Sequence, residues 1–352
     1  MRAAQFFGKG DIRVVDVSKP VRKDGEVLIE IENCGVCGSD LAEFTMGPVA
    51  VPVPGRPHPL TGETLPVTMG HEFCGRVKEA PANSSLKEGQ AVMVDPRIYC
   101  GSCTRCQSSA TNNCHQFGFH GLSGGGGGFS EFVTVDEKMC YPLPDSVPLE
   151  YAALIEPLAV AWHAAKQADL PDFKGKTVLI IGGGPVGIAM VHCLKHFRAD
   201  KVIVSEPTAT RQAQNRTIAD VVLDPITQSV PDECRALTKG VGVDVAFDCS
   251  GAQPGVDAAM DALRNRGLFI NVAAKPIVPP FMHWILKEIT LKCTLAYDDK
   301  DFGEVVNEFA KGSFNVKSMV TSRISLEDAP KAFSELVNKK DDHIKILISH
   351  KY

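Results

Sequence analysis

The sequence predicts two domains of different class: an all-β, barrel-like domain and an α/β domain built on a doubly wound parallel sheet. Its 352 residues exceed what one ordinary hydrophobic core holds. The first third alternates short strand-like runs, such as Val27–Ile31 and Ala91–Val94, with loops rich in proline and glycine, which is typical of all-β domains. From about Gly175, continuous β-branched runs alternate with helical segments, which indicates a parallel sheet.

The individual elements follow from the same patterns. In the first domain a further strand, Phe129–Val135, follows five consecutive glycines, and six prolines make residues 48–66 an irregular loop. In the second domain the expected strands are Thr177–Ile181, Lys201–Ser205, Asp220–Leu223, Val243–Phe247, Gly267–Asn271 and Thr290–Thr294. A helix over Asp301–Lys311 and a final strand over Ile344–Ile348 complete the chain.

Composition excludes several classes of partner. Hydrophobic residues make up 44% of the chain and charged residues 22%, as in soluble globular proteins, and the net charge is −5. We therefore expect neither nucleic acid nor an anionic membrane as partner. The first residues lack the apolar core of a signal peptide, and no apolar stretch is long enough to span a membrane. Twelve cysteines in such a chain indicate a reducing compartment, and we expect the cytoplasm.

Four cysteines within fifteen residues have the spacing of a metal site. Cys100, Cys103, Cys106 and Cys114 form a C-x2-C-x2-C-x7-C pattern, in which four thiolates can close a tetrahedral structural zinc site. Disulfides are disfavoured by the expected reducing compartment. An iron–sulfur cluster is the serious alternative, although such runs usually end in Cys-Pro and His115 follows here. We favour structural zinc.

A glycine-rich turn in the second domain predicts a dinucleotide site. Residues 182–187 read GGGPVG, in which Pro185 and Val186 are also expected to contact the cofactor. They stand directly after a strand and at the head of the helical segment Gly187–Phe197. Gly182 permits the tight turn, Gly184 lets the backbone approach a pyrophosphate, and Gly187 lets helix and strand pack closely. The helix N-terminus then offers N–H groups to the phosphates.

Two further residues bear on the choice of dinucleotide. Glu206 ends the second strand of this domain, nineteen residues after Gly187, where a carboxylate can accept hydrogen bonds from a ribose diol. A carboxylate there repels a 2′-phosphate, so we expect NAD rather than NADP. Arg211 lies within reach of the same ribose, and we do not expect it alone to overcome Glu206.

A second set of potential metal ligands lies outside the quartet. Cys37, the pair His71-Glu72 and Glu156 are the residues concerned. Each has a structural alternative: a buried thiol for Cys37, a hydrogen-bonded core histidine for His71, and a helix N-cap before Pro157 for Glu156. Spacing alone does not decide between these readings.

Together these segments resemble the zinc-dependent medium-chain dehydrogenase/reductase family. The resemblance runs from Arg2 to Ile348 and rests on Gly35–Asp40, Gly70–Glu72, the cysteine quartet, Glu156–Leu158, the glycine turn and Glu206. It is closest to the polyol (sorbitol) and 2,3-butanediol dehydrogenase branch, by Gly118–Ser123, Glu156–His163 and Ser205–Pro207. It implies a GroES-like catalytic domain at 1–155, a Rossmann NAD-binding domain at 156–296, and a return to the catalytic domain at 297–352.

The resemblance also implies a catalytic site. Cys37, His71 and Glu156 would face a catalytic zinc, with Glu72 as a fourth or exchanging ligand. Ser39 would take the proton of the substrate hydroxyl and pass it to the nicotinamide ribose, and Asp40 would orient His71. A turn serine is the structural alternative for Ser39.

One position departs from the family. Its members commonly carry a histidine three residues beyond Ser39, at the solvent end of the proton relay, and this chain has Ala42. We therefore expect water or another base there, and a weaker response of turnover to pH near neutrality.

The expected activity is NAD-dependent oxidation of a secondary alcohol, a vicinal diol or polyol, to its ketone. We expect 2,3-butanediol and acetoin first and sorbitol or xylitol second. A zinc-independent quinone reductase is disfavoured by the metal ligands, and a non-catalytic NAD-binding structural protein is the alternative from another class. The expected partners are the small alcohol or ketone and further copies of the chain, as a homodimer or homotetramer.

Overall fold

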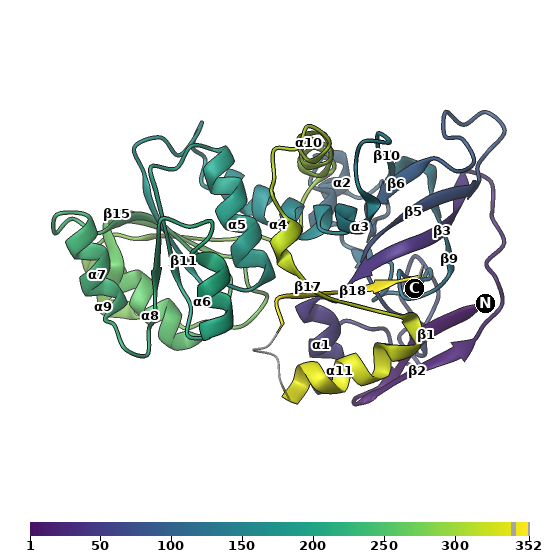
Figure 1. Ribbon diagram of the computed structural model, residues 1–352, viewed down its shortest axis with the longest axis horizontal. Coiled ribbons are helices and arrows are strands. Elements are labelled where there is room, and N and C mark those ends of the chain that lie inside the picture. The colour runs from purple at the N-terminus through teal and green to yellow at the C-terminus, as the bar shows by residue number, and fades with distance from the viewer. Residues whose placement is uncertain (339–342, 351–352) are drawn as a thin grey trace. The chain divides into compact units, whose positions relative to one another are not determined.

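The computed structural model describes residues 1–338 and 343–350 of the chain (Figure 1). It divides into two compact units, Met1–Glu156 with Asp298–Tyr352, and Pro157–Tyr297. From the sequence, the domain boundaries were expected at 155/156 and 296/297. Each lies one residue before the corresponding boundary between the two units. Within the described residues, no helix has both the length and the apolar character needed to cross a membrane.

The first unit is built mainly on antiparallel sheets. Its largest sheet has the order β10 (Cys140–Pro142), β6 (Ala91–Val94), β5 (Glu72–Glu79), β3 (Glu26–Gly35), β18 (Lys345–Ser349) and β17 (Val320–Ile324), with β9 (Phe132–Asp136) also paired to β3. Two smaller sheets contain β2 (Asp11–Asp16), β1 (Arg2–Gly8) and β4 (Val67–Thr68), and β7 (Arg97–Ile98) with β8 (Gly118–Phe119). The last strand of the chain is therefore an interior strand of this unit.

Helices also belong to the first unit, which the sequence had predicted as all-β. They are α1 (Gly38–Met46), α2 (Thr104–Gln107), α3 (Leu149–Ala152), α10 (Asp299–Ala310) and α11 (Ala329–Asn338), and α4 (Ile155–Lys166) begins at its boundary. Of these, only α10 was located from the sequence. The buried Glu43 on α1 accepts hydrogen bonds from the backbone N–H groups of Val49 and Ala50, at 2.7 and 2.5 Å. This carboxylate fixes the start of the proline-rich loop.

The second unit is a doubly wound α/β domain. Its six parallel strands have the order β13 (Val221–Leu223), β12 (Lys201–Ser205), β11 (Thr177–Ile181), β14 (Val243–Asp248), β15 (Leu263–Asn271) and β16 (Thr290–Cys293). The helices α5 (Pro185–His196), α6 (Ala209–Asn215), α7 (Val230–Leu237), α8 (Gln253–Ala262) and α9 (Phe281–Leu286) connect them. Val178, Leu179 and Ile180 of β11 are fully buried, each stabilising the domain by about 1.5–3 kcal/mol.

The order of these strands places the glycine turn at a switch point. The chain runs from β11 to β12 and β13 on one side and then crosses to β14 on the other side of β11, so the strand order reverses at β11. In open parallel sheets, ligands bind in the crevice beyond the strand ends at this point. The predicted doubly wound sheet is confirmed, and the glycine turn lies at the point where such sheets commonly bind a nucleotide.

Candidate metal centres and nucleotide-binding loop

The first candidate centre is organised by the start of α1. Cys37 is the N-cap of this helix, and its backbone N–H donates to the Oδ2 atom of Asp40 at 2.9 Å. The Asp40 side chain is completely buried, so its carboxylate is held in a single place. Asp40 therefore fixes the backbone from which the Cys37 thiol projects.

The same carboxylate orients His71, which directly precedes β5. His71 Nδ1 lies 3.3 Å from Asp40 Oδ1, and His71 Nε2 lies 3.0 Å from Ser39 Oγ. Burial lowers the pKa of His71, but the charges of Asp40 and Cys37 more than offset it and raise that pKa well above its usual range. His71 therefore lies between the side chains of Asp40 and Cys37, in surroundings that favour a positive charge such as that of a metal ion.

Three of the four predicted catalytic ligands form one group. Ligand atoms of Cys37, His71 and Glu72 all lie within 4.8 Å of one another. A thiolate, an imidazole and a carboxylate are the donor types of catalytic zinc sites. The residues present therefore fit a zinc ion. Glu156 is buried but is not part of this group, and its role as a ligand stays a prediction.

Glu72 has a partner that the sequence analysis missed. The Nζ atom of Lys345, on β18, lies 2.7 Å from both carboxylate oxygens of Glu72 and donates a third hydrogen bond to the carbonyl of Val36 at 3.1 Å. Only 2% of Lys345 and none of Glu72 is exposed. A signal was present, because a lysine within the apolar run 344–348 indicates a buried charge that needs a partner.

Phe119 on β8 was also missed as a residue next to the centre. Its ring centroid lies 5.6 Å from that of His71, and Phe117 packs edge-on against it at 5.1 Å. These aromatic rings give the centre an apolar neighbour on one side. The sequence contained Phe119 in a segment resembling the polyol branch, but no pattern placed it beside His71.

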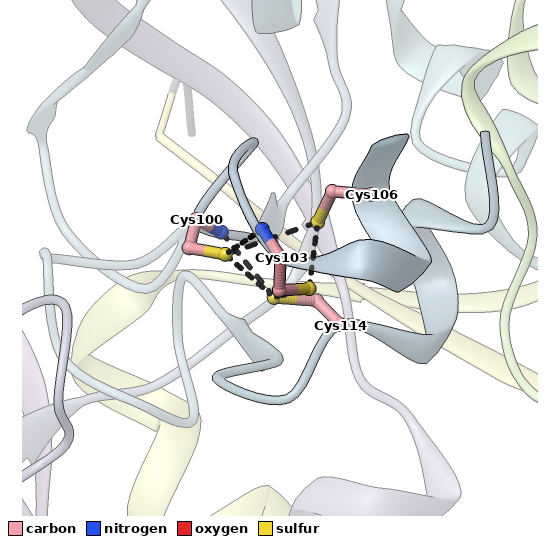
Figure 2. Close-up of side chains that lie close together, drawn as sticks. All are labelled: Cys100, Cys103, Cys106 and Cys114. Atoms are coloured by element: carbon pink, nitrogen blue, oxygen red, sulfur yellow. Dashed lines mark hydrogen bonds between the residues drawn. The ribbon is translucent and has the colours of Figure 1, made fainter. Parts of the chain in front are cut away.

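The cysteine quartet forms the second candidate centre (Figure 2). Four pairs of its sulfur atoms lie 3.5 to 4.0 Å apart. Four sulfurs at about 2.3 Å from one central ion lie about 3.8 Å from each other, so the spacing fits a single zinc ion. Backbone N–H groups of Cys100 and Cys103 donate to Cys114 Sγ and Cys100 Sγ, at 3.3 and 3.4 Å.

The two alternatives for the quartet fit less well. All twelve cysteines lie in the described part of the chain and carry free thiols, which removes the disulfide reading. A 4Fe–4S cluster binds each thiolate to a different iron, and a 2Fe–2S cluster divides the four between two irons, so both hold some of the sulfurs further apart than one ion does. Backbone hydrogen bonds from Ser102 and Cys103 lower the pKa of Cys100 to about 6, which favours the thiolate form that binds metal.

The glycine turn has the geometry of a nucleotide-binding loop. Gly182 has a φ of 92°, in the left-handed region where glycine is favoured. Gly184 is the N-cap of α5, and Pro185 occupies its first turn. A Cβ atom on Gly187 would lie 1.9 Å from the carbonyl oxygen of Gly182, so no side chain fits there. The predicted reasons for Gly182 and Gly187 are visible in these contacts.

Glu206 and Arg211 lie next to this loop. The Glu206 carboxylate accepts hydrogen bonds from the backbone N–H of Gly183 at 2.7 Å and of Thr208 at 2.9 Å. A Cβ atom on Gly184 would lie 3.9 Å from a guanidinium nitrogen of Arg211. Glu206 therefore ties the glycine turn to the end of β12, where the adenosine ribose of a dinucleotide is expected.

Three more polar side chains gather at the carboxyl ends of neighbouring strands. Asp248, Asn271 and Thr294 follow one another across β14, β15 and the end of β16. Asp248 Oδ2, Asn271 Oδ1 and Thr294 Oγ1 are buried and, among the described residues, make no hydrogen bond. Buried polar atoms of this kind need a partner, and a dinucleotide bound along this edge supplies one. The residues present therefore fit the cofactor.

Comparison with known proteins shows the family. Residues 23–145 match the alcohol dehydrogenase GroES-like domain, and residues 185–311 match the zinc-binding dehydrogenase domain. A (R,R)-butanediol dehydrogenase of Neisseria gonorrhoeae is 35% identical over 99% of both chains. The crystal structure of 2R,3R-butanediol dehydrogenase from Bacillus subtilis has a TM-score of 0.90, with 35% identity over 99% of both chains.

A probable D-xylulose reductase A of Aspergillus fumigatus is 32% identical over 97% of this chain and 94% of its own. These matches confirm the expected GroES-like and Rossmann domains, and zinc and a nicotinamide dinucleotide as cofactors. The full-length similarity, the two candidate metal centres and the glycine loop all indicate the same family. The chain belongs to the zinc-dependent medium-chain dehydrogenase/reductase family, in its butanediol and polyol dehydrogenase branch, and is an oxidoreductase.

Proposed function

We propose that this enzyme oxidises a vicinal secondary diol to the corresponding hydroxyketone with NAD⁺, and that 2,3-butanediol and acetoin are its substrate pair. The observation that carries the proposal is the grouping of Cys37, His71 and Glu72 beside Ser39. The names of the relatives supply the substrate class, since two of them are butanediol dehydrogenases.

The residues of the centre divide the work between them. Cys37, His71 and Glu72 would hold the zinc, with Glu156 as a further ligand. A zinc ion bound there acts as a Lewis acid that makes the substrate hydroxyl easier to deprotonate. Ser39 Oγ accepts that proton and passes it on, and Asp40 keeps His71 Nε2 directed at the site. Phe119 shields one side of the centre from water.

Two measurements test this assignment. Initial rates over a panel of butane-2,3-diol stereoisomers, sorbitol, xylitol and simple secondary alcohols should be highest for a butanediol. Replacing Cys37 by alanine should abolish turnover while NADH binding, followed by fluorescence titration, stays near normal. Cys74→Ala, which removes a buried thiol outside the ligand group, is the matched control. Retained turnover in Cys37→Ala overturns the ligand role.

A polyol such as sorbitol or xylitol is the second candidate substrate. The similarity to a probable D-xylulose reductase favours it, and the same panel decides between the two. A non-catalytic structural protein is distinguished by metal analysis. Two zinc ions per chain support the enzyme, one supports the cysteine quartet alone, and none removes both assignments.

We infer a preference for NAD over NADP from Glu206. Its carboxylate is almost completely buried at the glycine turn and accepts two backbone hydrogen bonds, so it is fixed near the expected ribose. A carboxylate in that place accepts hydrogen bonds from the 2′- and 3′-hydroxyls and repels a 2′-phosphate. The ratio of kcat/KM for the two cofactors measures the preference directly.

We also infer that the chain forms a homo-oligomer through the second unit. The strand β16 pairs with β15 on one edge and, within the described residues, with nothing on the other. Large apolar side chains beside it are exposed, namely Val278, Phe281, Met282, Trp284, Ile285, Leu286, Leu291 and Leu295. A second copy related by a two-fold axis can pair with this edge and cover these side chains. Light scattering should show a dimer or tetramer, and Leu291→Lys should give smaller species.

We also propose that the protein is located in a reducing compartment, the cytoplasm. All twelve cysteines are free thiols, and a metal-binding quartet needs them reduced. Cell fractionation with an antibody against the chain should place it in the cytoplasm. Recovery from an oxidising compartment would contradict this.

A further inference from the structure

The pair formed by Lys345 and Glu72 has an unusual place in the first unit. Both side chains are buried, they lie 273 positions apart in the sequence, and they meet because β18 is inserted next to β3. A buried ion pair is costly to form and is retained only where its geometry is good. Here both oxygens of Glu72 are bonded by one ammonium group.

The Glu72 carboxylate is packed closely against a neighbouring strand. A Cβ atom on Gly35 would lie 2.0 Å from Glu72 Oε2, so the carboxylate packs directly against the backbone of β3. The same carboxylate belongs to the group that includes Cys37 and His71. One carboxylate therefore faces the ammonium group and the expected metal at once.

The ammonium group of Lys345 is surrounded by negative charge. Glu72, Cys37 and Glu156 all stabilise its charged form electrostatically, and Glu72 has the largest effect of the three. These are the same three side chains that, with His71, the proposed function assigns to the zinc. Lys345 thus supplies positive charge to the anions among which the metal is expected.

We propose that Lys345 is a positioning residue that holds Glu72 in place before the metal binds and afterwards competes with the metal for the same carboxylate. The proposal rests on the proposed catalytic metal centre. It follows that Lys345 lowers the zinc affinity of this centre and keeps Glu72 an exchangeable ligand. A like charge close to a divalent ion weakens binding of that ion, most strongly where water is excluded.

The alternative is that Lys345 only holds Glu72 in the orientation that binds zinc, as many residues that hydrogen-bond to metal ligands do. Removal of such a partner typically weakens metal binding by about 10- to 100-fold. Competition predicts the opposite sign, because removal of Lys345 leaves Glu72 with the metal as its sole counter-cation. The sign of the change in zinc affinity therefore separates the two roles.

The experiment compares Lys345→Met with Lys345→Arg, which keeps the charge, and with Lys331→Met, which removes an exposed lysine elsewhere in the same unit. Zinc release from the loaded proteins into excess chelator is followed with a zinc-sensitive dye. The release phase of the catalytic centre is the one that Cys37→Ala lacks. We expect release from Lys345→Met to be at least about tenfold slower than from the wild type, since most affinity changes appear in the dissociation rate.

Two further measurements complete the test. The metal-free form of Lys345→Met should unfold at lower denaturant concentration than the metal-free wild type, and zinc should restore most of the difference. In the double variant Glu72→Gln with Lys345→Met, release should equal that of Glu72→Gln alone. Unchanged or faster release in Lys345→Met overturns the proposal. If Cys37→Ala lacks no release phase, the proposed metal centre itself is wrong, which is a different failure.

Discussion

Gly187 and Gly184 lie three residues apart in the nucleotide loop, and the structure assigns them different roles that alanine substitutions can separate. In Gly187→Ala the new Cβ would meet a backbone carbonyl oxygen at 1.9 Å, about 1.5 Å inside ordinary contact. Backbone cannot move aside as a side chain can, so the start of α5 must shift. Overpacking of this kind costs about 1–3 kcal/mol.

In Gly184→Ala the situation differs. Gly184 has a φ of −76°, which alanine adopts freely, and the nearest atom to a new Cβ is the end of the flexible Arg211 at 3.9 Å. The protein without cofactor should therefore be as stable as the wild type. The methyl group would nevertheless stand where the backbone approaches a pyrophosphate, so NADH should bind at least about tenfold more weakly.

Calorimetry measures both quantities. Thermal unfolding of the cofactor-free proteins should show a lower melting temperature for Gly187→Ala, by about 2–4 °C for each kcal/mol, and an unchanged one for Gly184→Ala. Titration with NADH should show weaker binding in both variants. A Gly187→Ala protein that melts and binds NADH like the wild type would refute the packing argument. A destabilised Gly184→Ala would refute the assigned division of roles.

Three other predictions follow from the sites. Cys103→Ala should lose one zinc equivalent and lower the melting temperature because metal binding is coupled to folding, whereas exposed Cys293→Ala should do neither. Glu206→Ser should raise kcat/KM for NADP relative to NAD by about tenfold or more; continued rejection of NADP would exclude the ribose contact. Ala42→His adds a group with a pKa of about 6.5, so kcat should depend more strongly on pH between about pH 6 and 7 than in the wild type. An unchanged profile would contradict the relay argument.

The second unit was predicted closely because its signals are local. Thr177–Ile181 and Lys201–Ser205 have the bounds read from the sequence, since a continuous β-branched run between breakers specifies a buried strand. β15 begins at Leu263 rather than at the expected Gly267. The first half of β15 contains the polar residues 264–266, which interrupt the apolar pattern expected of a buried strand, and its pairing with β14 is irregular there.

The first unit was predicted less completely because its elements depend on distant contacts. Helix α1 was missed, since its start is set by a capping contact between Asp40 and Cys37 rather than by an apolar repeat. The ligand types at Cys37, His71 and Glu72 could be read from the family resemblance, and the structure adds that they converge. Lys345 could not be assigned to Glu72, because nothing in the sequence fixes which strand lies beside β3.

The place of β18 has a consequence for biosynthesis. During translation, β3 and β5 emerge early, but β18, which pairs with β3, is made only after the whole of the second unit. Until then the nascent first unit has an unpaired stretch of backbone at the end of β3, and Glu72 lacks its ammonium partner, while the nucleotide-binding unit can already fold on the ribosome. The last strand to be synthesised pairs with this stretch and completes the surroundings of the metal ligands.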